Sequence, residues 1–181
     1  MKFMAISLFA LCLPVIAFCQ DITGLWTGTL YNDSTQQFHD YEIGISKENG
    51  KYVAISKTCF LKDQKKYEAV KKVKVRIAAD GKIVVEDGEL VYNNYPVQAP
   101  KEVRQLNVLD LQKQDDQYLL SGIFVTNTTK KYLPLTGKIS LKRSAGFSST
   151  DLQHYLQKDQ AAREMNTNTG AEPLVKNEKD K

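Results

Sequence analysis

The sequence predicts an all-β protein, an antiparallel up-and-down barrel of about eight strands followed by a short C-terminal helix and a disordered tail. Two observations predict it. Short segments rich in β-branched and aromatic residues follow one another at spacings typical of antiparallel sheets. Clusters of Asn, Asp and Gly separate these segments, and such residues favour tight turns. The predicted strands cover residues 22–31, 41–46, 52–60, 66–77, 83–92, 104–112, 118–127 and 131–143.

Composition, alternation and turn chemistry indicate the first three strands. Residues 22–31 are rich in β-branched and aromatic side chains. In the second strand, Tyr41, Ile43 and Ile45 alternate with polar or small residues and would share one face. Asn49-Gly50 predicts a two-residue hairpin turn, because both residues tolerate a positive φ. The run that follows this turn is the returning third strand.

The next three strands continue the alternation with one interruption. Residues 73–77 alternate between apolar and basic side chains, and an Asp-Gly turn leads from them into the fifth strand. In the sixth strand, Leu106 and Val108 are out of phase with Leu109 and Leu111. This change of phase predicts a β-bulge.

The longest predicted loop joins the fifth and sixth strands. Residues 93–103 contain two prolines and have no period. The start of this loop is the candidate mouth of the barrel: Asn93, Asn94, Tyr95 and Pro96. The polar residues 128–130 then separate the seventh strand from the eighth.

The composition changes after residue 143. Thr150 and Gln153 fit the capping box of a short helix, and the chain is polar from residue 166 onward. Three apolar residues form a narrow stripe at helical spacing: Leu152, Tyr155 and Leu156. A lone short helix is marginal without packing, so we expect residues 144–181 to be dispensable for the fold.

Residues 1–19 have the pattern of a secretory signal peptide. Lys2 precedes an apolar run without charge, and the small residues Ala17 and Cys19 fit the third and first positions before a cleavage site. Cleavage there leaves Gln20 as the new N-terminus. The expected domains are therefore a signal peptide over 1–19, a barrel domain over 20–143, and a linker, helix and tail over 144–181.

Two other interpretations of the N-terminus stay open. The apolar run reaches the lower edge of membrane-spanning length, so an uncleaved anchor is one alternative. Lipidation of Cys19 is the other, although Phe18 stands where lipoprotein signals prefer a small residue. Cleavage fits the pattern better and predicts a periplasmic or secreted protein without a transmembrane segment.

The tripeptide Gly24-Leu25-Trp26 lies near the start of the first predicted strand. A G-x-W at the start of an eight-stranded antiparallel series resembles the lipocalin-like (calycin) barrels. The resemblance covers about residues 22–143 and implies that Trp26 closes the base of the barrel, with Arg143 of the last strand packed across it. The chain also resembles an uncharacterised group of exported Bacteroidota proteins, which implies no activity.

Strand parity supports the same arrangement independently. Gly24, Trp26 and Gly28 share one parity in the first strand, and Ile139, Leu141 and Arg143 share one in the last: both sets are expected to face the interior. Pairing the first strand with the last closes the barrel and removes both edges. Arg143 would then lie beside Trp26, where a guanidinium stacks on an indole. Inward glycines are expected to leave interior space.

Composition and motifs exclude several classes of function. The formal net charge is only +4, and the lysines and arginines have no aromatic platform, so no nucleic-acid partner is expected. The sequence has no catalytic signature of the common hydrolase, metalloprotease or phosphate-loop types, so we expect no enzyme, no cofactor and no metal. Cys59 is the one cysteine left after cleavage and cannot form an internal disulfide.

Two functions remain. A barrel of about eight strands can hold one small ligand, so the first is an exported binding protein for a small apolar or amphipathic molecule. The alternative is a non-catalytic envelope interaction module with a filled barrel, which docks on another envelope protein through the loop or the tail. A monomer is expected in both cases.

Overall fold

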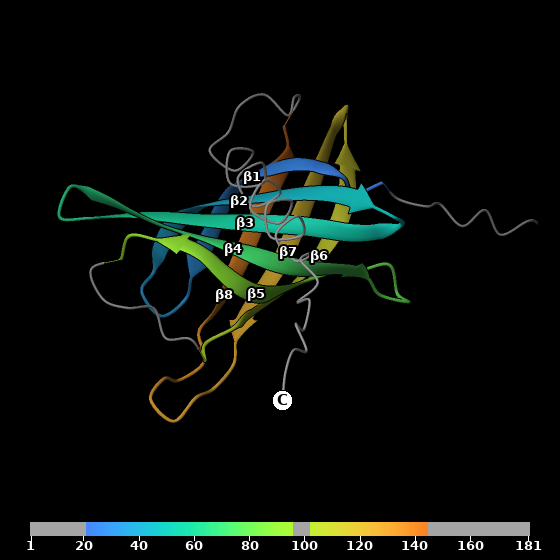
Figure 1. The fold of residues 1–181 in the computed structure, drawn as a ribbon. Helices are drawn as coiled ribbons and strands as arrows, with labels where there is room; N and C mark the ends of the chain where they lie inside the picture. Colours follow the sequence, from blue (N-terminus) through green and yellow to red (C-terminus); the bar gives the residue numbers. More distant parts are fainter. Residues whose placement is uncertain (1–20, 96–101, 145–181) are drawn as a thin grey trace, which may run out of the picture.

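The computed structural model describes residues 21–95 and 102–144, and these form one closed antiparallel barrel of eight strands (Figure 1). The predicted fold class is thereby confirmed. The signal peptide, the C-terminal helix and tail, and Pro96 lie outside the described residues. The strands are β1 (Gly24–Asn32), β2 (Gln37–Glu48), β3 (Lys51–Lys62), β4 (Lys65–Ile77), β5 (Ile83–Asn93), β6 (Gln105–Gln114), β7 (Gln117–Thr126) and β8 (Thr136–Arg143).

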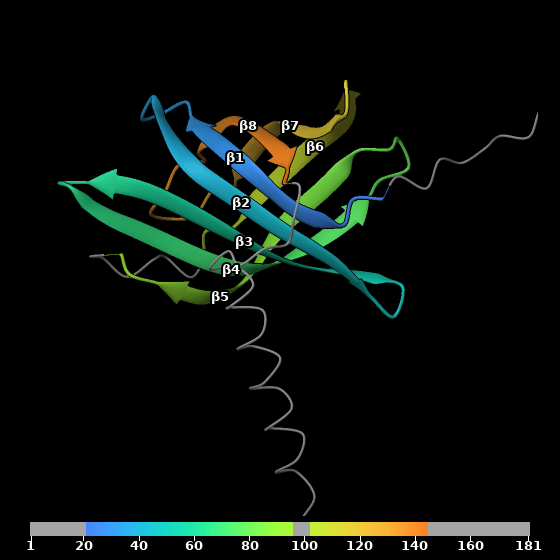
Figure 2. The same cartoon turned by 90° about the horizontal axis from the view of Figure 1, so that it is seen from above.

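The barrel closes where β1 pairs with β8. Each strand otherwise pairs with the next one in the chain, and Trp26 lies opposite Arg143 in the closing pair. This closure gives β1 and β8, the first and last strands, a hydrogen-bonding partner on each side. Viewed from above, β4 and β5 lie across the barrel from β7 and β8 (Figure 2).

Tight turns follow the sequence where Asn, Asp and Gly occur. Asn49 (φ 49°) and Gly50 (φ 79°) both have a positive φ between β2 and β3, as the hairpin prediction requires. Asp63 (φ 52°) and Gln64 (φ 62°) repeat this conformation between β3 and β4 without a glycine. The described part of the chain contains no helix long and apolar enough to cross a membrane.

We call the end of the barrel that holds Trp26 and Arg143 the base, and the end that holds the β1–β2 and β5–β6 connections the mouth. Apolar side chains from all eight strands fill the interior toward the base. The most completely buried are Trp26, Ile43, Ile45, Ile83, Val85, Leu109, Leu120 and Leu141. The lower interior is therefore a packed core rather than an open cavity.

Three details differ from the sequence-based expectation. β8 begins at Thr136 rather than at residue 131, and Pro134 lies in the segment before it. β6 pairs regularly along its length with β7, and its predicted bulge is wrong. The irregularity lies instead between β4 and β5, near Lys71. β6 loses its apolar phase because a polar residue, Asn107, faces the interior and is buried.

The third difference concerns the inward glycines. A Cβ at Gly28 would lie 2.1 Å from the backbone oxygen of Ser140, so the neighbouring strand occupies that space. Gly122 and Gly137 are crowded by neighbouring backbone in the same way. These glycines allow close approach of strands in a coiled sheet, and they do not open a cavity.

The barrel wall divides toward the mouth at two seams. At the first seam, the pairing between β2 and β3 ends at Asp40 and Cys59. Beyond these residues, β2 still pairs with β1, and β3 still pairs with β4. β5 pairs with β6 only from Ile83 to Glu86. We call the segment between these seams, residues 59–68 and 88–95, the flap. In Figure 1 the β3–β4 hairpin of the flap extends beyond the other strands at the left.

Candidate functional site

The base is closed by a stack of three side chains. The guanidinium carbon of Arg143 lies 4.8 Å from the Trp26 ring centroid and 4.6 Å from that of Tyr118. The expected contact between Trp26 and Arg143 is thus present, and Tyr118 adds a second aromatic face. Cation–π attraction and apolar contact both favour this arrangement.

Local geometry explains why these residues meet. The Trp26 Nε1 donates a 3.0 Å hydrogen bond to the Ile22 carbonyl, so the indole is buried without an unsatisfied donor. Gly24 has a φ of 124°, which favours glycine, and a Cβ there would lie at an ordinary contact distance of 3.7 Å from the Arg143 stem. Arg143 also donates to the Asp21 carbonyl. These contacts close the base of the barrel, so a ligand could enter only from the mouth.

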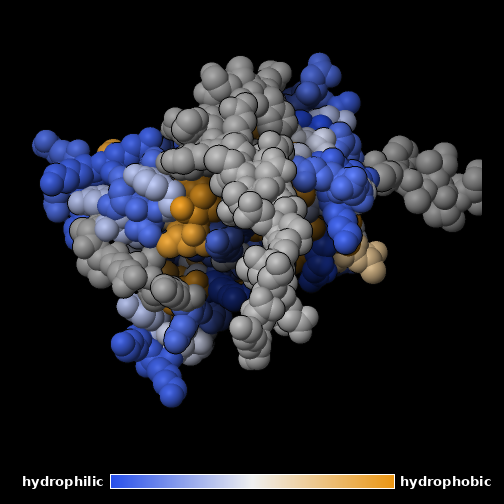
Figure 3. Space-filling model, viewed as in Figure 1, coloured by the Kyte–Doolittle hydropathy of each residue, from blue (hydrophilic) through white to orange (hydrophobic). Residues whose placement is uncertain are grey.

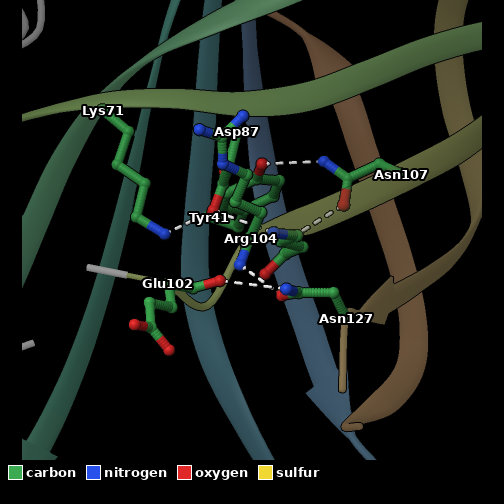
Figure 4. Close-up of polar contacts among 8 residues, drawn as sticks. Tyr41, Lys71, Asp87, Glu102, Arg104, Asn107 and Asn127 are labelled. Carbon is green, nitrogen blue, oxygen red and sulfur yellow. Dashed lines mark hydrogen bonds and ion pairs between the residues drawn. The ribbon is translucent and has the colours of Figure 1, made fainter. Parts of the chain in front are cut away.

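A buried polar cluster lies where β5 leaves β6, and we call it the fork cluster: Tyr41, Lys71, Asp87, Gln105 and Asn107 (Figure 4). Its carboxylate belongs to Asp87, whose side chain is only 6% exposed. Asp87 accepts hydrogen bonds from the Lys71 ammonium and from the Gln105 backbone N–H, the latter at 3.1 Å. The Lys71 side chain keeps 30% of its surface exposed. A paired charge of this kind tolerates burial, whereas a single one would not.

The other half of the fork cluster is uncharged. Asn107 Nδ2 donates to the Tyr41 hydroxyl oxygen at 3.0 Å, and Gln105 Nε2 donates to Asn107 Oδ1 at 2.7 Å. Burial, with the nearby Asp87 charge, raises the pKa of the Tyr41 hydroxyl well above its usual value. Tyr41 therefore stays protonated at neutral pH, and its hydroxyl forms hydrogen bonds with Ser56 as well as with Asn107.

An aromatic cluster lines the inner face of the flap. The Phe60 ring centroid lies 5.5 Å from Tyr67, 5.2 Å from Tyr95 and 5.7 Å from His39, which approaches edge-on from β2 across the seam. Burial raises the pKa of Tyr95 to about 12. Burial also lowers the pKa of His39, and its buried Nδ1 has no hydrogen-bond partner among the described residues.

A groove follows the seam between β2 and β3. It has a volume of about 470 Å³ and opens to solvent. Its lining comes from both strands and the adjoining turn of β4: Gln37, Phe38, His39, Asp40, Cys59, Phe60, Leu61 and Lys66. The groove thus gives access from outside to the edge of the aromatic cluster.

The structure places most of the predicted mouth residues at the flap. The Asn94 side chain bridges the β4 backbone, because its Oδ1 accepts from Glu68 N at 2.7 Å and its Nδ2 donates to Lys66 O at 3.2 Å. Asn93 Oδ1 accepts from the Tyr95 N–H at 3.2 Å. Asn93 and Asn94 therefore shape the loop, while Tyr95 alone joins the aromatic cluster.

Sequence reasoning missed the fork cluster. Lys71 lies within a basic run of β4, and Asp87 follows another carboxylate, Glu86, so neither pattern indicates a buried ion pair. The available signal was the loss of apolar phase at Asn107, since a polar residue at an inward position needs polar partners. Among the described residues, no group of three His, Cys, Asp or Glu side chains could hold a metal ion.

Comparisons of the chain with protein-family models, with curated proteins and with solved structures gave no match. The function is therefore inferred from the geometry of the mouth.

Proposed function

We propose that this chain is an exported, non-catalytic binding protein that holds a small amphipathic ligand at the mouth of the barrel, in the periplasm or outside the cell. The observation that carries the proposal is that an aromatic cluster and a polar cluster lie close together at the mouth. Tyr95 of the aromatic cluster interacts electrostatically with Asp87 of the fork cluster, and His39 lies two residues from Tyr41 on the same face of β2. The aromatic cluster offers an apolar surface, and the fork cluster offers hydrogen-bonding groups. Pockets for small ligands commonly combine an apolar lining with a few polar groups.

The charge of the fork cluster limits the ligand's polar group. Lys71 and Asp87 neutralise each other, so the cluster has no net charge to offer. A carboxylate or an amine would meet one partner of the ion pair favourably and the other unfavourably. A neutral hydroxyl or amide group, which can both donate and accept, fits better.

The packed base limits the ligand's length. Leu109, Leu120 and Leu141 have no exposed surface in the interior below the fork cluster. A long chain could enter only by displacing these side chains, at a cost typical of core disruption. The expected ligand is therefore short or bent, with its apolar part against Phe60 and Tyr67.

The test uses Nile red, a neutral apolar dye, and alanine variants of the aromatic cluster. Phe60→Ala and Tyr67→Ala should each weaken dye binding by roughly tenfold, because each removes an aromatic face. Ile123→Ala is the control: Ile123 is 58% exposed and lies on the outer face of β7, away from the flap. Equal affinities for all three variants and the unmodified protein would contradict the proposed site.

A second measurement addresses the natural ligand. Native mass spectrometry of the protein purified from its own host should show an added small-molecule mass that is lost on unfolding. The mature chain in the same spectrum should begin at Gln20 if export occurs as proposed.

The alternative proposal is an interaction module with a filled barrel. It is supported by large apolar side chains exposed near the mouth, notably Leu61 at 76% and Leu133 at 83%. Exposed apolar residues that gather at one end of a molecule commonly mark a protein interface. Absence of both dye binding and a retained ligand would favour this alternative.

A further inference from the structure

The outer wall of the barrel carries a second apolar cluster, which we call the wall patch: Leu25, Ile55 and Val70, with Val91 packed against it. These side chains point outward by register, because their neighbours Trp26, Ala54 and Val73 belong to the interior core. Nevertheless, Leu25 is 3% exposed, Ile55 is 1% and Val70 is 0%.

The strand pairing explains how the wall patch is assembled. Gly44 lies between Leu25 and Ile55 in the pairing of β1, β2 and β3. Because Gly44 has no side chain, the two larger residues can approach each other above it. Val70 is the diagonal neighbour of Ile55 on β4, since Ile55 pairs with Lys72. Four adjacent strands therefore present one continuous apolar surface.

Burial on this wall is unusual for the molecule. Lys57, which also points outward beside Val70, is only 5% exposed. On the opposite wall, the outward residues of β8 are exposed along the strand: Thr136, Lys138, Ser140 and Lys142. The wall itself contributes to the covering of Lys57, because its ammonium forms a 3.2 Å ion pair with Glu42 of β2. Figure 3 shows apolar surface between hydrophilic side chains on the side of the molecule viewed in Figure 1.

The path of the chain points to the occupant. The last described residue, Ser144, donates a 2.8 Å backbone hydrogen bond to the carbonyl of Leu25, which is itself a member of the wall patch. Residues 145–181 therefore start at the edge of this surface. The eight residues from Ser144 to Leu152 can span about 26 Å, whereas the patch extends over about 14 Å from β1 to β4.

We infer that the wall patch is the docking surface for the chain's own C-terminal segment, residues 145–156. This segment has the apolar side chains that such a surface requires: Phe147, Leu152, Tyr155 and Leu156. Burial of apolar area supplies the attraction, and covalent attachment at Ser144 makes the association intramolecular. The segment is then an integral part of the folded unit, in contrast to the sequence-based expectation that it is dispensable.

The experiment compares the mature full-length chain with a chain truncated after Ser144. Lysine acylation, mapped by mass spectrometry, should modify Lys57 roughly tenfold faster in the truncated chain, because local covering limits access. Lys74 is the internal control, since it lies exposed on the outer face of β4 in the same molecule. The truncation should also lower Tm by about 5 °C, which corresponds to the loss of a modest packed surface.

A second pair of variants keeps the length of the chain constant. The triple variant Phe147→Ser, Leu152→Ser and Leu156→Ser should reproduce the faster acylation of Lys57. Leu174→Ser, which changes an apolar residue of the tail beyond the proposed docking segment, should not.

Two results would overturn the inference. One is an unchanged acylation rate of Lys57 in both the truncated chain and the triple variant. The other is a full-length chain that sediments as a dimer and loses protection of Lys57 on dilution, because a second copy would then be the occupant.

Discussion

Arg143 shows how much of the base depends on single side chains. Its guanidinium lies between the rings of Trp26 and Tyr118, and its stem passes over Gly24, whose φ of 124° favours glycine. The planar cation offers both faces to aromatic rings while its rim donates to a backbone carbonyl. Lysine could not replace it in this geometry, because an ammonium has no planar face.

The contact between Trp26 and Arg143 should be measurable as a coupling energy. Trp26→Ala should lower the free energy of unfolding by about 3–5 kcal/mol, because it removes a fully buried ring. Arg143→Ala should cost about 1 kcal/mol. The double variant should cost less than the sum, since both changes remove the same contact. Denaturant unfolding measures all three, and Lys142→Ala is the control because Lys142 points outward. Additive effects would mean that the two residues do not interact.

His39 should make the stability of the protein sensitive to mild acid. Burial lowers the pKa of His39 below its usual 6.5, so the folded state resists protonation. As the pH falls below 6.5, the unfolded chain binds a proton first, and the free energy of unfolding decreases. His39→Phe should remove this part of the decrease, and unfolding curves measured between about pH 7 and 5 test it. If the free energy of unfolding falls equally with pH in the unmodified protein and in His39→Phe, other titratable groups are responsible.

At the scale of elements, two asparagines anchor the connection between β5 and β6. Asn94 joins its start to β4, and Asn127 joins its end to β7. Asn127 Oδ1 accepts from Arg104 N at 2.7 Å, and its Nδ2 donates to Glu102 O at 2.9 Å. Each amide side chain thus takes the place of a backbone peptide group: Asn94 extends the pairing of β4 with β5, and Asn127 extends that of β6 with β7.

Replacement of Asn127 should loosen this connection without unfolding the barrel. In Asn127→Ala, the Arg104 amide loses its acceptor and should exchange its hydrogen about tenfold faster, corresponding to a local loss of about 1 kcal/mol. Asn127→Asp keeps the oxygen acceptor, so its Arg104 amide should exchange close to the original rate. Hydrogen exchange measured by NMR gives both rates. Equal acceleration in both variants would show that the side-chain oxygen is not the partner.

At the scale of the whole molecule, the barrel combines a rigid base with a divided mouth. β6 and β7 pair from Gln105 to Gln114, whereas β5 and β6 pair only from Ile83 to Glu86. Pairing along a full strand adds cross-strand contacts at every position, so the short seam is the weakest part of the wall. The proposed ligand site lies at this weak part, which agrees with the general location of binding sites in regions of lower local stability.

Native-state hydrogen exchange should reveal this division. Amides of β7 and β8 should exchange only by global unfolding, because both strands pair along their lengths. Amides of β5 after Asp87 should exchange through a smaller opening, with a free energy at least about 2 kcal/mol lower. A ligand bound at the mouth should slow the second group selectively. Uniform exchange across all strands would contradict this account of the seam.

The sequence by itself determined the features that depend on local chemistry. The number of strands follows from alternation and turn residues, and the β2–β3 turn follows from the tolerance of Asn49 and Gly50 for a positive φ. The inward parity of Trp26 and Arg143 follows from the period of two in a strand. Each of these features depends either on residues adjacent in sequence or on the alternation of inward and outward residues along a strand.

Only the tertiary structure decided where the barrel divides and which polar residues face inward. Lys71 and Asp87 give no signal in the sequence, and Asn107 shows only as a break in the apolar alternation. They come together because the irregular β4–β5 pairing and the short β5–β6 seam bring three strands together. The wall patch has the same origin, since Leu25, Ile55 and Val70 come from three different strands. Burial and electrostatic pairing depend on contacts between segments that are distant in sequence. The strand register sets these contacts, and local sequence patterns do not specify that register.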